Sequence, residues 1–287
     1  MALNSLCEAE KIYALHGVQD DFRVDGRQRD DYRPMELETE FLPQAMGSAR
    51  LRLANTDVIV GIIAEVEKPQ IDRPNEGKIE FFVDCSANAT PAFEGRGGEQ
   101  LATEISNCLK VAFSSSQAFN LTSLCVVPKH VCWKLNIDIL ILECGGNLFD
   151  AVSLAVKAAL FNTKLPSIVK SEVDGPEIYI EISDNPYEYR SFDIKDIPIM
   201  VTLCKIGEHC VVDPSSDEEQ CCSCSIVLAI SGERICSVIK QGAGSFHPIT
   251  LIESLEFGKT IASTLDQALL DALERESKVD NRQAVRF

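Results

Sequence analysis

Apolar and polar residues along this chain follow two periods, one typical of strands and one typical of helices. Residues 35–41 alternate strictly, with Glu36, Glu38 and Glu40 on one face, which predicts a half-buried strand. From Glu99 onward, apolar residues recur every three or four positions, which predicts an amphipathic helix. The same two patterns predict an almost wholly apolar helix at 150–162 and further strands at 49–53, 58–66, 79–85, 124–127, 131–142, 177–182, 197–206, 211–212, 225–230 and 235–239.

The ends and the middle of the chain carry weaker signals. Residues 5–8 fit a capping box for a short helix that runs to about His16 and stops at Gly17. Residues 20–33 are polar and rich in turn formers, which predicts a surface arm. Pro248 opens a long helix, and we expect its polar end, 274–287, to fray. Residues 167–196 contain two prolines and are the expected hinge between the halves. Strands and helices therefore alternate in both halves, and the predicted fold class is α+β, with two βα layers sharing one core.

Composition excludes several classes of protein. The chain has 27 basic and 44 acidic residues and a formal net charge of −17, which disfavours autonomous nucleic-acid binding but suits a basic protein partner. Without an apolar run of roughly 18–20 residues, we expect no membrane span. The twelve cysteines occur without a secretory signal, so we expect reduced thiols and a cytosolic or nuclear compartment.

The most informative segment for chemistry is a buried strand that runs into Gly145 and Gly146 and then into a helix. Backbone N–H groups converge at such a turn and can hold an anion. The alternative is that the two glycines serve only tight packing. The residues that follow are Asn147, Leu148 and Phe149, so the loop offers no Arg, Lys or Ser to a phosphate. We therefore expect a pocket without cations.

Charged residues elsewhere allow both functional and purely structural interpretations. Asp213 and Glu219 would suit a metal ion or a general acid/base pair, or would form a solvated acidic loop. Arg23 and Arg27 flank an Asp-Gly turn, where they would bind carboxylates or phosphates bidentately or form an intrachain salt bridge. Arg96 lies in a glycine-rich loop, from which it would reach RNA or a partner's carboxylate. The alternative is that it is an ordinary exposed arginine of a surface loop.

A cysteine cluster at 221–224 contains one C-x-x-C spacing. A zinc site would need a second pair of ligands, and His209 with Cys210 is the nearby candidate. The alternative is a cysteine-rich strand. The histidines show no ligand-like spacing, so the sequence predicts neither a metal nor a cofactor.

Four motifs, taken in order, resemble the RNase PH family between about residues 23 and 258. They are Arg23-Val-Asp-Gly-Arg27, Gly47-Ser-Ala49 with Asn55-Thr-Asp-Val58, the strand and turn at 138–146, and Asp213 with Glu219. The resemblance implies an RNase PH-like fold with mixed sheets and central helices. We predict an N-terminal helix and arm at 1–30, an N-terminal domain at 31–166, a C-terminal domain at 195–275 and a polar tail at 276–287.

A narrower set of motifs resembles the family members that form the ring of the eukaryotic RNA exosome. These motifs lie at 74–77, 82–86, 94–98, 142–151 and 156–163. The resemblance implies a subunit of a six-member ring of RNase PH-like chains, capped by proteins with RNA-binding domains. Such a ring contacts RNA as an assembly and guides it to a nuclease for 3′→5′ processing and degradation. It also implies a location in the nucleus and nucleolus, and in the cytoplasm.

The sequence departs from the phosphorolytic members of the family at three places. Those enzymes follow the double glycine with Thr/Ser-Arg-Thr/Ser, where this chain has Asn147 and Leu148. They carry arginines on the first central helix, where this chain has Asn107, and a catalytic Asp where it has Glu219. The resemblance therefore implies a non-catalytic ring subunit. The alternatives are an active phosphate-dependent 3′→5′ exoribonuclease and, from another class, a zinc or redox protein.

Overall fold

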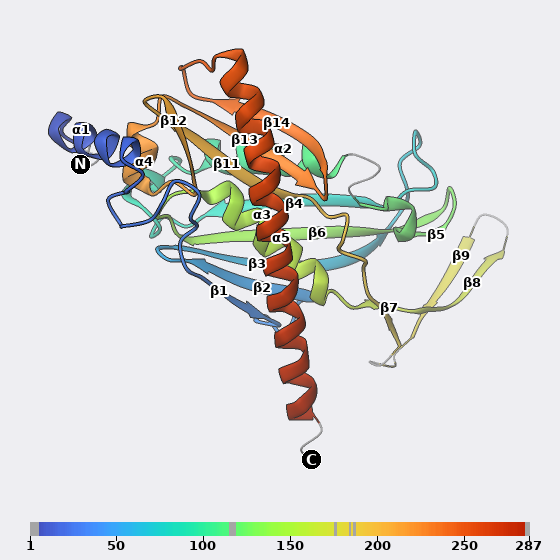
Figure 1. The fold of residues 1–287 in the computed structure, drawn as a ribbon. Helices are drawn as coiled ribbons and strands as arrows, with labels where there is room; N and C mark the ends of the chain where they lie inside the picture. The colour runs from blue at the N-terminus through green and yellow to red at the C-terminus, as the bar shows by residue number, and fades with distance from the viewer. Residues whose placement is uncertain (1–5, 115–118, 175–176, 184, 186–187, 285–287) are drawn as a thin grey trace.

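The computed structural model describes residues 6–114, 119–174, 177–183, 185 and 188–284 (Figure 1). Two large sheets and three long helices make up most of the fold. The helices are α1 (Glu8–Gln19), α2 (Glu99–Phe113), α3 (Leu148–Asn162), α4 (Ser216–Cys221) and α5 (Pro248–Ala284), with short 3₁₀ turns at Pro91–Phe93 and Leu121–Leu124.

The first sheet belongs to the N-terminal half and has six strands in the order β1-β2-β3-β6-β4, with β5 paired to β6. The β4–β6 pair is parallel and the other pairs are antiparallel, so the sheet is mixed. Its central strand, β6, buries alternate residues because successive side chains point to opposite faces. The strands are β1 (Met35–Thr39), β2 (Gly47–Leu53), β3 (Thr56–Glu67), β4 (Lys78–Cys85), β5 (Cys125–Val127) and β6 (Val131–Glu143).

The second sheet has four antiparallel strands in the order β12-β11-β13-β14. Its strands are β11 (Ile199–Ile206), β12 (His209–Val212), β13 (Cys224–Ser231) and β14 (Arg234–Gln241). Thr202 of β11 donates a hydrogen bond to Asp150 of α3, whereas its neighbour Leu203 packs near Gly258 of α5. Since neighbouring strand residues point to opposite faces, α3 and the first half of α5 cover opposite faces of this sheet.

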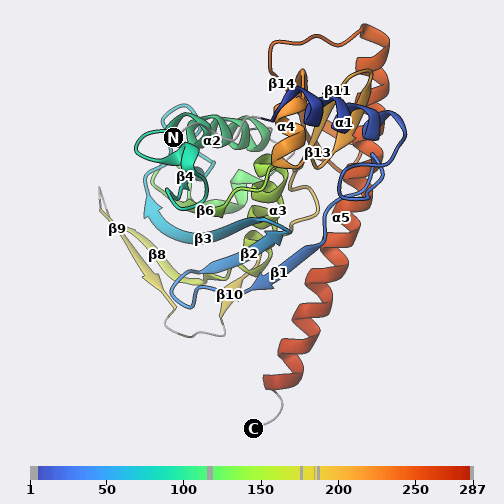
Figure 2. The same cartoon turned by 90° about the vertical axis from the view of Figure 1, so that its left-hand side faces the viewer.

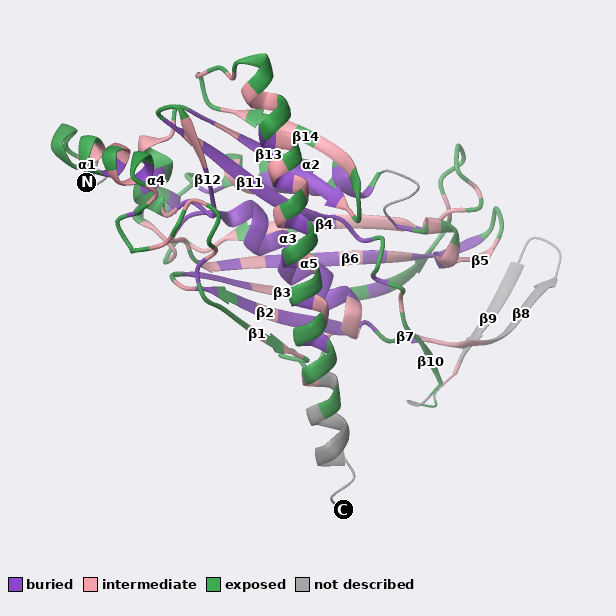
Figure 3. Cartoon of the chain, viewed as in Figure 1, coloured by how far each residue is buried: buried purple, intermediate pink, exposed green. Residues whose placement is uncertain are grey.

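Helices α2 and α3 occupy the space between the two sheets (Figure 2). Helix α3 is buried around almost its whole circumference from Leu148 to Leu160, which its apolar sequence requires (Figure 3). One continuous set of buried side chains extends from β2 and β3 through α3 to β11 and β13. The predicted α+β class, with two βα layers sharing one core, is therefore confirmed.

The C-terminal helix α5 continues past the second sheet and along the first (Figure 1). The Lys157 ammonium of α3 lies 2.7 Å from the Asp266 carboxylate of α5. One further contact lies near the end, where the Thr39 N–H of β1 donates to the Glu276 carboxylate at 2.8 Å. The structure describes this helix as continuous to Ala284, past residue 274, from which we expect its polar end to fray.

The N-terminal segment corrects two predictions. Helix α1 begins after Cys7, which forms the capping box with Glu10, and it continues to Gln19. The predicted cap at Ser5 lies outside the described residues. Gly17 does not end the helix. A β-carbon there would lie 2.7 Å from the Phe22 carbonyl oxygen, so glycine allows the following chain to pack closely. Most residues of the predicted surface arm at 20–33 are exposed, as expected, but Arg23 and Arg33 are buried.

The expected hinge at 167–196 carries strands. β8 (Ile168–Asp174) pairs antiparallel with β9 (Glu177–Ile182), and the two-residue strands β7 (Leu165–Pro166) and β10 (Tyr189–Arg190) pair with each other. Strand β9 was predicted from the sequence. Strand β8 was missed, because its charged residues obscure the alternation of apolar and polar positions. Helix α4 was missed because six residues are too short for a periodic signal. None of the described helices is long and apolar enough to cross a membrane.

Candidate functional site

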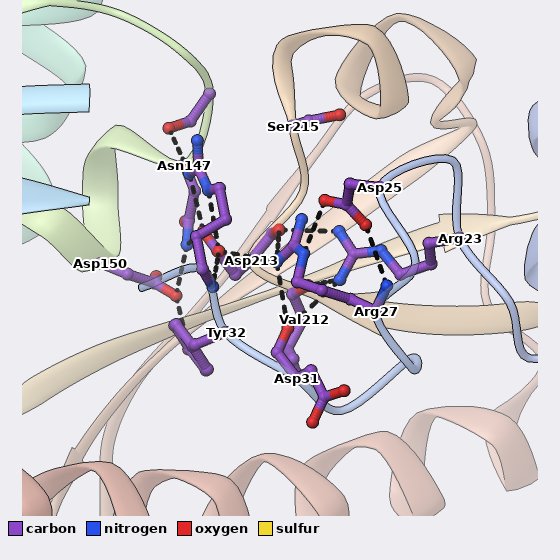
Figure 4. Close-up of polar contacts among 12 residues, drawn as sticks. Arg23, Asp25, Arg27, Asp31, Tyr32, Asn147, Asp150, Val212, Asp213 and Ser215 are labelled. Atoms are coloured by element: carbon purple, nitrogen blue, oxygen red, sulfur yellow. Dashed lines mark hydrogen bonds and ion pairs between the residues drawn. The ribbon is translucent and has the colours of Figure 1, made fainter. Parts of the chain in front are cut away.

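The candidate site lies where the N-terminal arm, the β6–α3 loop and the β12–α4 segment meet (Figure 4). We call it the arginine–aspartate junction and define it by Arg23, Arg27, Arg33, Asn147, Asp213, Glu218 and Glu219. Its three arginines come from the arm, Asn147 caps the start of α3, and the three carboxylates follow β12.

Tight backbone packing shapes the β6–α3 loop. Gly146 has a φ of +98°, and a β-carbon there would lie 2.6 Å from the Pro214 carbonyl oxygen. A β-carbon on Gly145 would lie 2.7 Å from the Asn55 side chain. The Thr56 hydroxyl donates to the Gly146 carbonyl at 2.7 Å. Only glycine fits at these two positions, as the packing interpretation predicted.

The Asp213 carboxylate is buried at the centre of the junction. It accepts two hydrogen bonds from the Arg33 guanidinium, at 2.8 and 2.9 Å, and one from Arg27 at 2.9 Å. The Asn147 amide donates a further bond at 2.8 Å. Burial alone would raise the pKa of Asp213, but the hydrogen bonds and charge of Arg33 outweigh it and lower the pKa below its ordinary value. Asp213 is therefore ionised and committed to the arginines.

A second buried ion pair joins Arg23 to Glu218 of α4. The guanidinium donates to both carboxylate oxygens, one of them at 2.8 Å, and also to the backbone carbonyls of Val212 and Asp213. The bidentate geometry suits Arg, whose planar fork matches a carboxylate. The intrachain salt-bridge interpretation of Arg23 is thus the one that the structure displays.

Asn147 links the junction to a buried carboxylate inside α3. Its backbone has a φ of +54°, a left-handed conformation that Asn tolerates better than most residues. Its amide also donates to Asp150 at 2.9 Å, as do the hydroxyls of Tyr32 and Thr202 at 2.8 and 2.7 Å. Burial raises the pKa of Asp150 to about 6, although these three hydrogen bonds oppose the rise. No cation contacts this carboxylate among the described residues.

Glu219 occupies the position at the start of α3 where an anion would bind. Its carboxylate accepts a hydrogen bond from the Asn147 backbone N–H at 2.8 Å. Part of the side chain is exposed, but desolvation by the surrounding protein raises the pKa of its carboxyl. The helix end is therefore already paired with a negative group of the same chain.

The charge balance of the junction corrects the expectation of a pocket without cations. Arg33 lies beside the loop and donates to the carbonyls of Gly145 and Gly146 at 2.9 and 3.0 Å, and Arg27 contacts the same Asp213 carboxylate as Arg33. Both arginines are paired with Asp213, and Arg27 also pairs with Asp25 at 2.7 Å. The cations are present, but the chain's own carboxylates neutralise them.

The remaining predicted site residues lie apart from this network. Leu148 is buried in the first turn of α3, and Asn107 lies on the exposed side of α2. Arg96 has an 88 % exposed side chain that pairs with Glu99 at 3.1 Å. None of the three has a hydrogen bond or ion pair to the junction among the described residues.

The cysteine cluster is divided between elements. Cys221 ends α4, Cys222 caps it, and Cys224 begins β13. His209 contacts the Arg29 guanidinium at 2.7 Å instead of these thiols. Within the part of the chain that the structure describes, no group of three or more His, Cys, Asp or Glu side chains is placed to hold a metal ion.

Sequence reasoning missed two central residues, Arg33 and Asp150. Arg33 sits in a polar segment without a motif, so no local signal distinguishes it. Asp150 did carry a signal, because it is the only acidic residue in the apolar helix 148–162. A lone carboxylate in such a helix must find hydrogen-bond donors, which indicates a polar site at its position.

Comparison with known proteins identifies the family. Residues 31–166 match the model of the 3′ exoribonuclease family, domain 1, and residues 196–261 match that of domain 2. The Thermococcus gammatolerans exosome complex component Rrp42 is 34 % identical, over 88 % of this chain and 90 % of the relative. The putative exosome complex exonuclease RRP42 of Dictyostelium discoideum is 29 % identical, over 90 % and 95 % of the two chains.

Solved structures agree with the sequence relatives. A chain of the Archaeoglobus fulgidus exosome with RNA bound to the active site superposes with a TM-score of 0.75 and 26 % identity, covering 91 % of this chain and 98 % of that one. An archaeal exosome core gives a TM-score of 0.73 and 25 % identity, covering 91 % and 96 %. With both domain models, the relatives and the fold in agreement, this chain belongs to the RNase PH family of 3′ exoribonucleases.

Proposed function

We propose that this chain is a non-catalytic subunit of an RNA exosome core ring. In this role it holds neighbouring RNase PH-like subunits and cap proteins in place and helps to line the path that RNA follows to a nuclease. Its similarity to exosome components of other organisms supports the assembly role.

The observation that carries the non-catalytic role is the internal neutralisation of the junction. Phosphorolysis brings inorganic phosphate to an RNA phosphodiester, so two anions must be stabilised together. Here Asp213 forms ion pairs with Arg27 and Arg33, and the Glu219 carboxylate accepts a hydrogen bond from the Asn147 N–H at the start of α3. Removal of one preorganised charge-stabilising donor typically costs a factor of about 10²–10³ in rate. Because both guanidinium groups and this N–H are already paired with carboxylates of the same chain, and of their nitrogen atoms only Arg27 Nη2 is buried without a hydrogen-bond partner among the described residues, we expect no measurable turnover.

A phosphorolysis assay tests this proposal. The purified chain is mixed with end-labelled oligo(A) and phosphate, and nucleoside diphosphate release is followed beside an active RNase PH family enzyme. We expect release from the active enzyme alone. Release by this chain at a comparable rate, abolished by Arg33→Ala, would show that the chain is an enzyme.

The second candidate, an active phosphate-dependent 3′→5′ exoribonuclease, is favoured by the three arginines at the junction. It requires Asp213 or Glu219 to move away when phosphate and RNA arrive. The same assay, repeated after the chain has joined its ring partners, tests whether a neighbour supplies further cations or frees these arginines.

The proposed ring also implies where the chain acts. We propose the nucleus and nucleolus, with a further pool in the cytoplasm, and a role in ribosomal RNA processing and messenger RNA turnover. Fluorescence imaging of the tagged chain tests the location. Signal confined to a membrane-bound organelle other than the nucleus would contradict it.

A further inference from the structure

The outer face of the six-stranded sheet is divided into two unlike halves. Helices α2 and α3 lie against the inner face, and no described helix lies against the outer one (Figure 2). Strands β3, β6 and β4 are neighbours, so their outward residues form cross-strand rows. Four successive rows are Glu65–Lys134–Lys78, Ile63–Asn136–Glu80, Gly61–Asp138–Phe82 and Ile59–Leu140–Asp84.

The first half of this face is suited to water. Its charged side chains neutralise one another, with the Lys134 ammonium 2.9 Å from the Glu80 carboxylate and the Lys78 ammonium 3.1 Å from that of Glu67. Exposed strands with alternating, paired charges are ordinary on a solvated sheet face. Nothing in this half calls for a partner.

The second half is apolar and hollowed. A groove of about 690 Å³ lies between the outward residues of β3, β6 and β4 and the segment from Leu42 to Ala45. Phe82 is 51 % exposed and Ile63 is 44 % exposed. Gly61 leaves room at the base of the groove, since a β-carbon there would lie 3.2 Å from Leu42 Cδ1. A contiguous apolar groove in the middle of a sheet face marks a binding surface.

The charges around this groove are unmatched. Asp84 and Asp138 are exposed and belong to the rows that contain Leu140 and Phe82. Neither carboxylate has a hydrogen bond or ion pair to another described residue, in contrast to Glu80 on the same strand. These carboxylates repel nucleic acid and attract basic side chains. A second copy of this chain would bring the same aspartates together across a two-fold contact.

We propose that this groove binds a neighbouring RNase PH-like subunit through a surface with an apolar centre and flanking Lys or Arg residues. The inference rests on the proposed function, because it names the surface that the ring uses. The apolar floor supplies area that the neighbour removes from water, while Asp84 and Asp138 select basic groups and fix the orientation.

Variants of the full chain, co-expressed with the RNase PH-like subunits of its own organism, test the proposal. Association is measured by native mass spectrometry of the assembly and by a titration of affinity. Phe82→Asp places a charge in the groove and should weaken association at least about 30-fold, the effect of a central interface residue. Asp138→Lys should weaken it about 10-fold by presenting a like charge to the neighbour. Glu80→Ala, on the same face of the same strand as Phe82, is the matched control and should stay within about 3-fold of the unchanged chain.

The outcomes distinguish a wrong assignment of the groove from a wrong proposed function. If the unchanged chain joins no RNase PH-like subunit, the proposed function fails. If it joins one and both groove variants join equally well, only the groove assignment is wrong. Selective loss of a cap protein, of self-association or of RNA binding would also overturn it. Phe82 and Asp138 are both exposed, so circular dichroism and thermal unfolding of the isolated variants should match those of the unchanged chain. Asp138→Lys alone decides the question should Phe82→Asp misfold.

Discussion

The arginine–aspartate junction and the groove on the outer face of the six-stranded sheet differ in whether their charged groups are paired. At the junction, three arginines and the end of α3 are all paired with carboxylates of the same chain. In the groove, Asp84 and Asp138 have no partner among the described residues, and Phe82 is half exposed. A region whose charges are satisfied internally stabilises the fold, whereas a region whose charges and apolar surface are unsatisfied is suited to binding. This difference is what we expect if, as proposed, the junction serves the fold and the chain binds its neighbour through another face.

The strongest way to break this comparison is to remove the central carboxylate of the junction. Asp213→Ala leaves Arg33 buried without its counter-ion and should lower the free energy of unfolding by about 3–5 kcal/mol, the usual cost of breaking a buried ion pair. Urea unfolding followed by circular dichroism measures the change. Asp213→Asn keeps the shape and tolerates the positive φ, so it should cost less. A loss below about 1 kcal/mol for the alanine variant would mean that the junction is not a structural element.

The pH dependence of stability tests Asp150, the buried carboxylate that Asn147 links to the junction. Asp150 has a pKa of about 6 in the fold against 3.8 for the ordinary side chain. Between these values the folded chain binds more protons than the unfolded chain, so the free energy of unfolding decreases as the pH rises, by up to about 3 kcal/mol in full. Urea unfolding at several pH values, compared with Asp150→Asn, isolates this contribution. A difference between the two proteins that stays constant with pH would contradict it.

Removing the carboxylate that occupies the N-terminal end of α3 tests the comparison further. Glu219→Ala frees the Asn147 N–H, and phosphate should then stabilise the variant by about 1.4 kcal/mol at a concentration ten times its Kd. The unchanged chain should show no such stabilisation. Thermal unfolding with and without phosphate measures both. Asp217→Ala, which removes an exposed charge from the same helix, is the matched control. Equal phosphate effects in the two variants would argue for a general charge effect.

The smallest expected effect is that of Arg96, which belongs to neither region. Arg96→Ala removes an exposed side chain and should change the free energy of unfolding by less than about 0.5 kcal/mol. Assembly should be unaffected. If Arg96 contacts RNA, as the sequence predicts, protection of RNA by the assembled ring should decrease because that contact loses its cation. Nuclease protection and crosslinking measure this change, with Arg96→Lys retaining the charge. Unchanged crosslinking in the alanine variant would remove Arg96 from the RNA path.

The sequence by itself determined most of the regular structure. The alternation in β2 and β3 and the helical period of α2 are local properties, because the side-chain geometry of a strand or a helix repeats within a few residues. The glycines of the β6–α3 loop were also readable, since the loop places them between a buried strand and a helix. The sequence also shows directly that the loop itself contains no Arg, Lys or Ser.

Only the tertiary structure decided how the charges are used. Arg33 and Asp213 are 180 residues apart, and no local pattern connects them. The arm was expected to be exposed because polar residues usually are, and most of it is, but Arg23 and Arg33 are buried because each pairs with an opposite charge. The groove could not be foreseen either. Whether alternate residues of β3, β4 and β6 face a helix, water or a neighbouring subunit depends on which side of the sheet the helices cover, and long-range packing determines that.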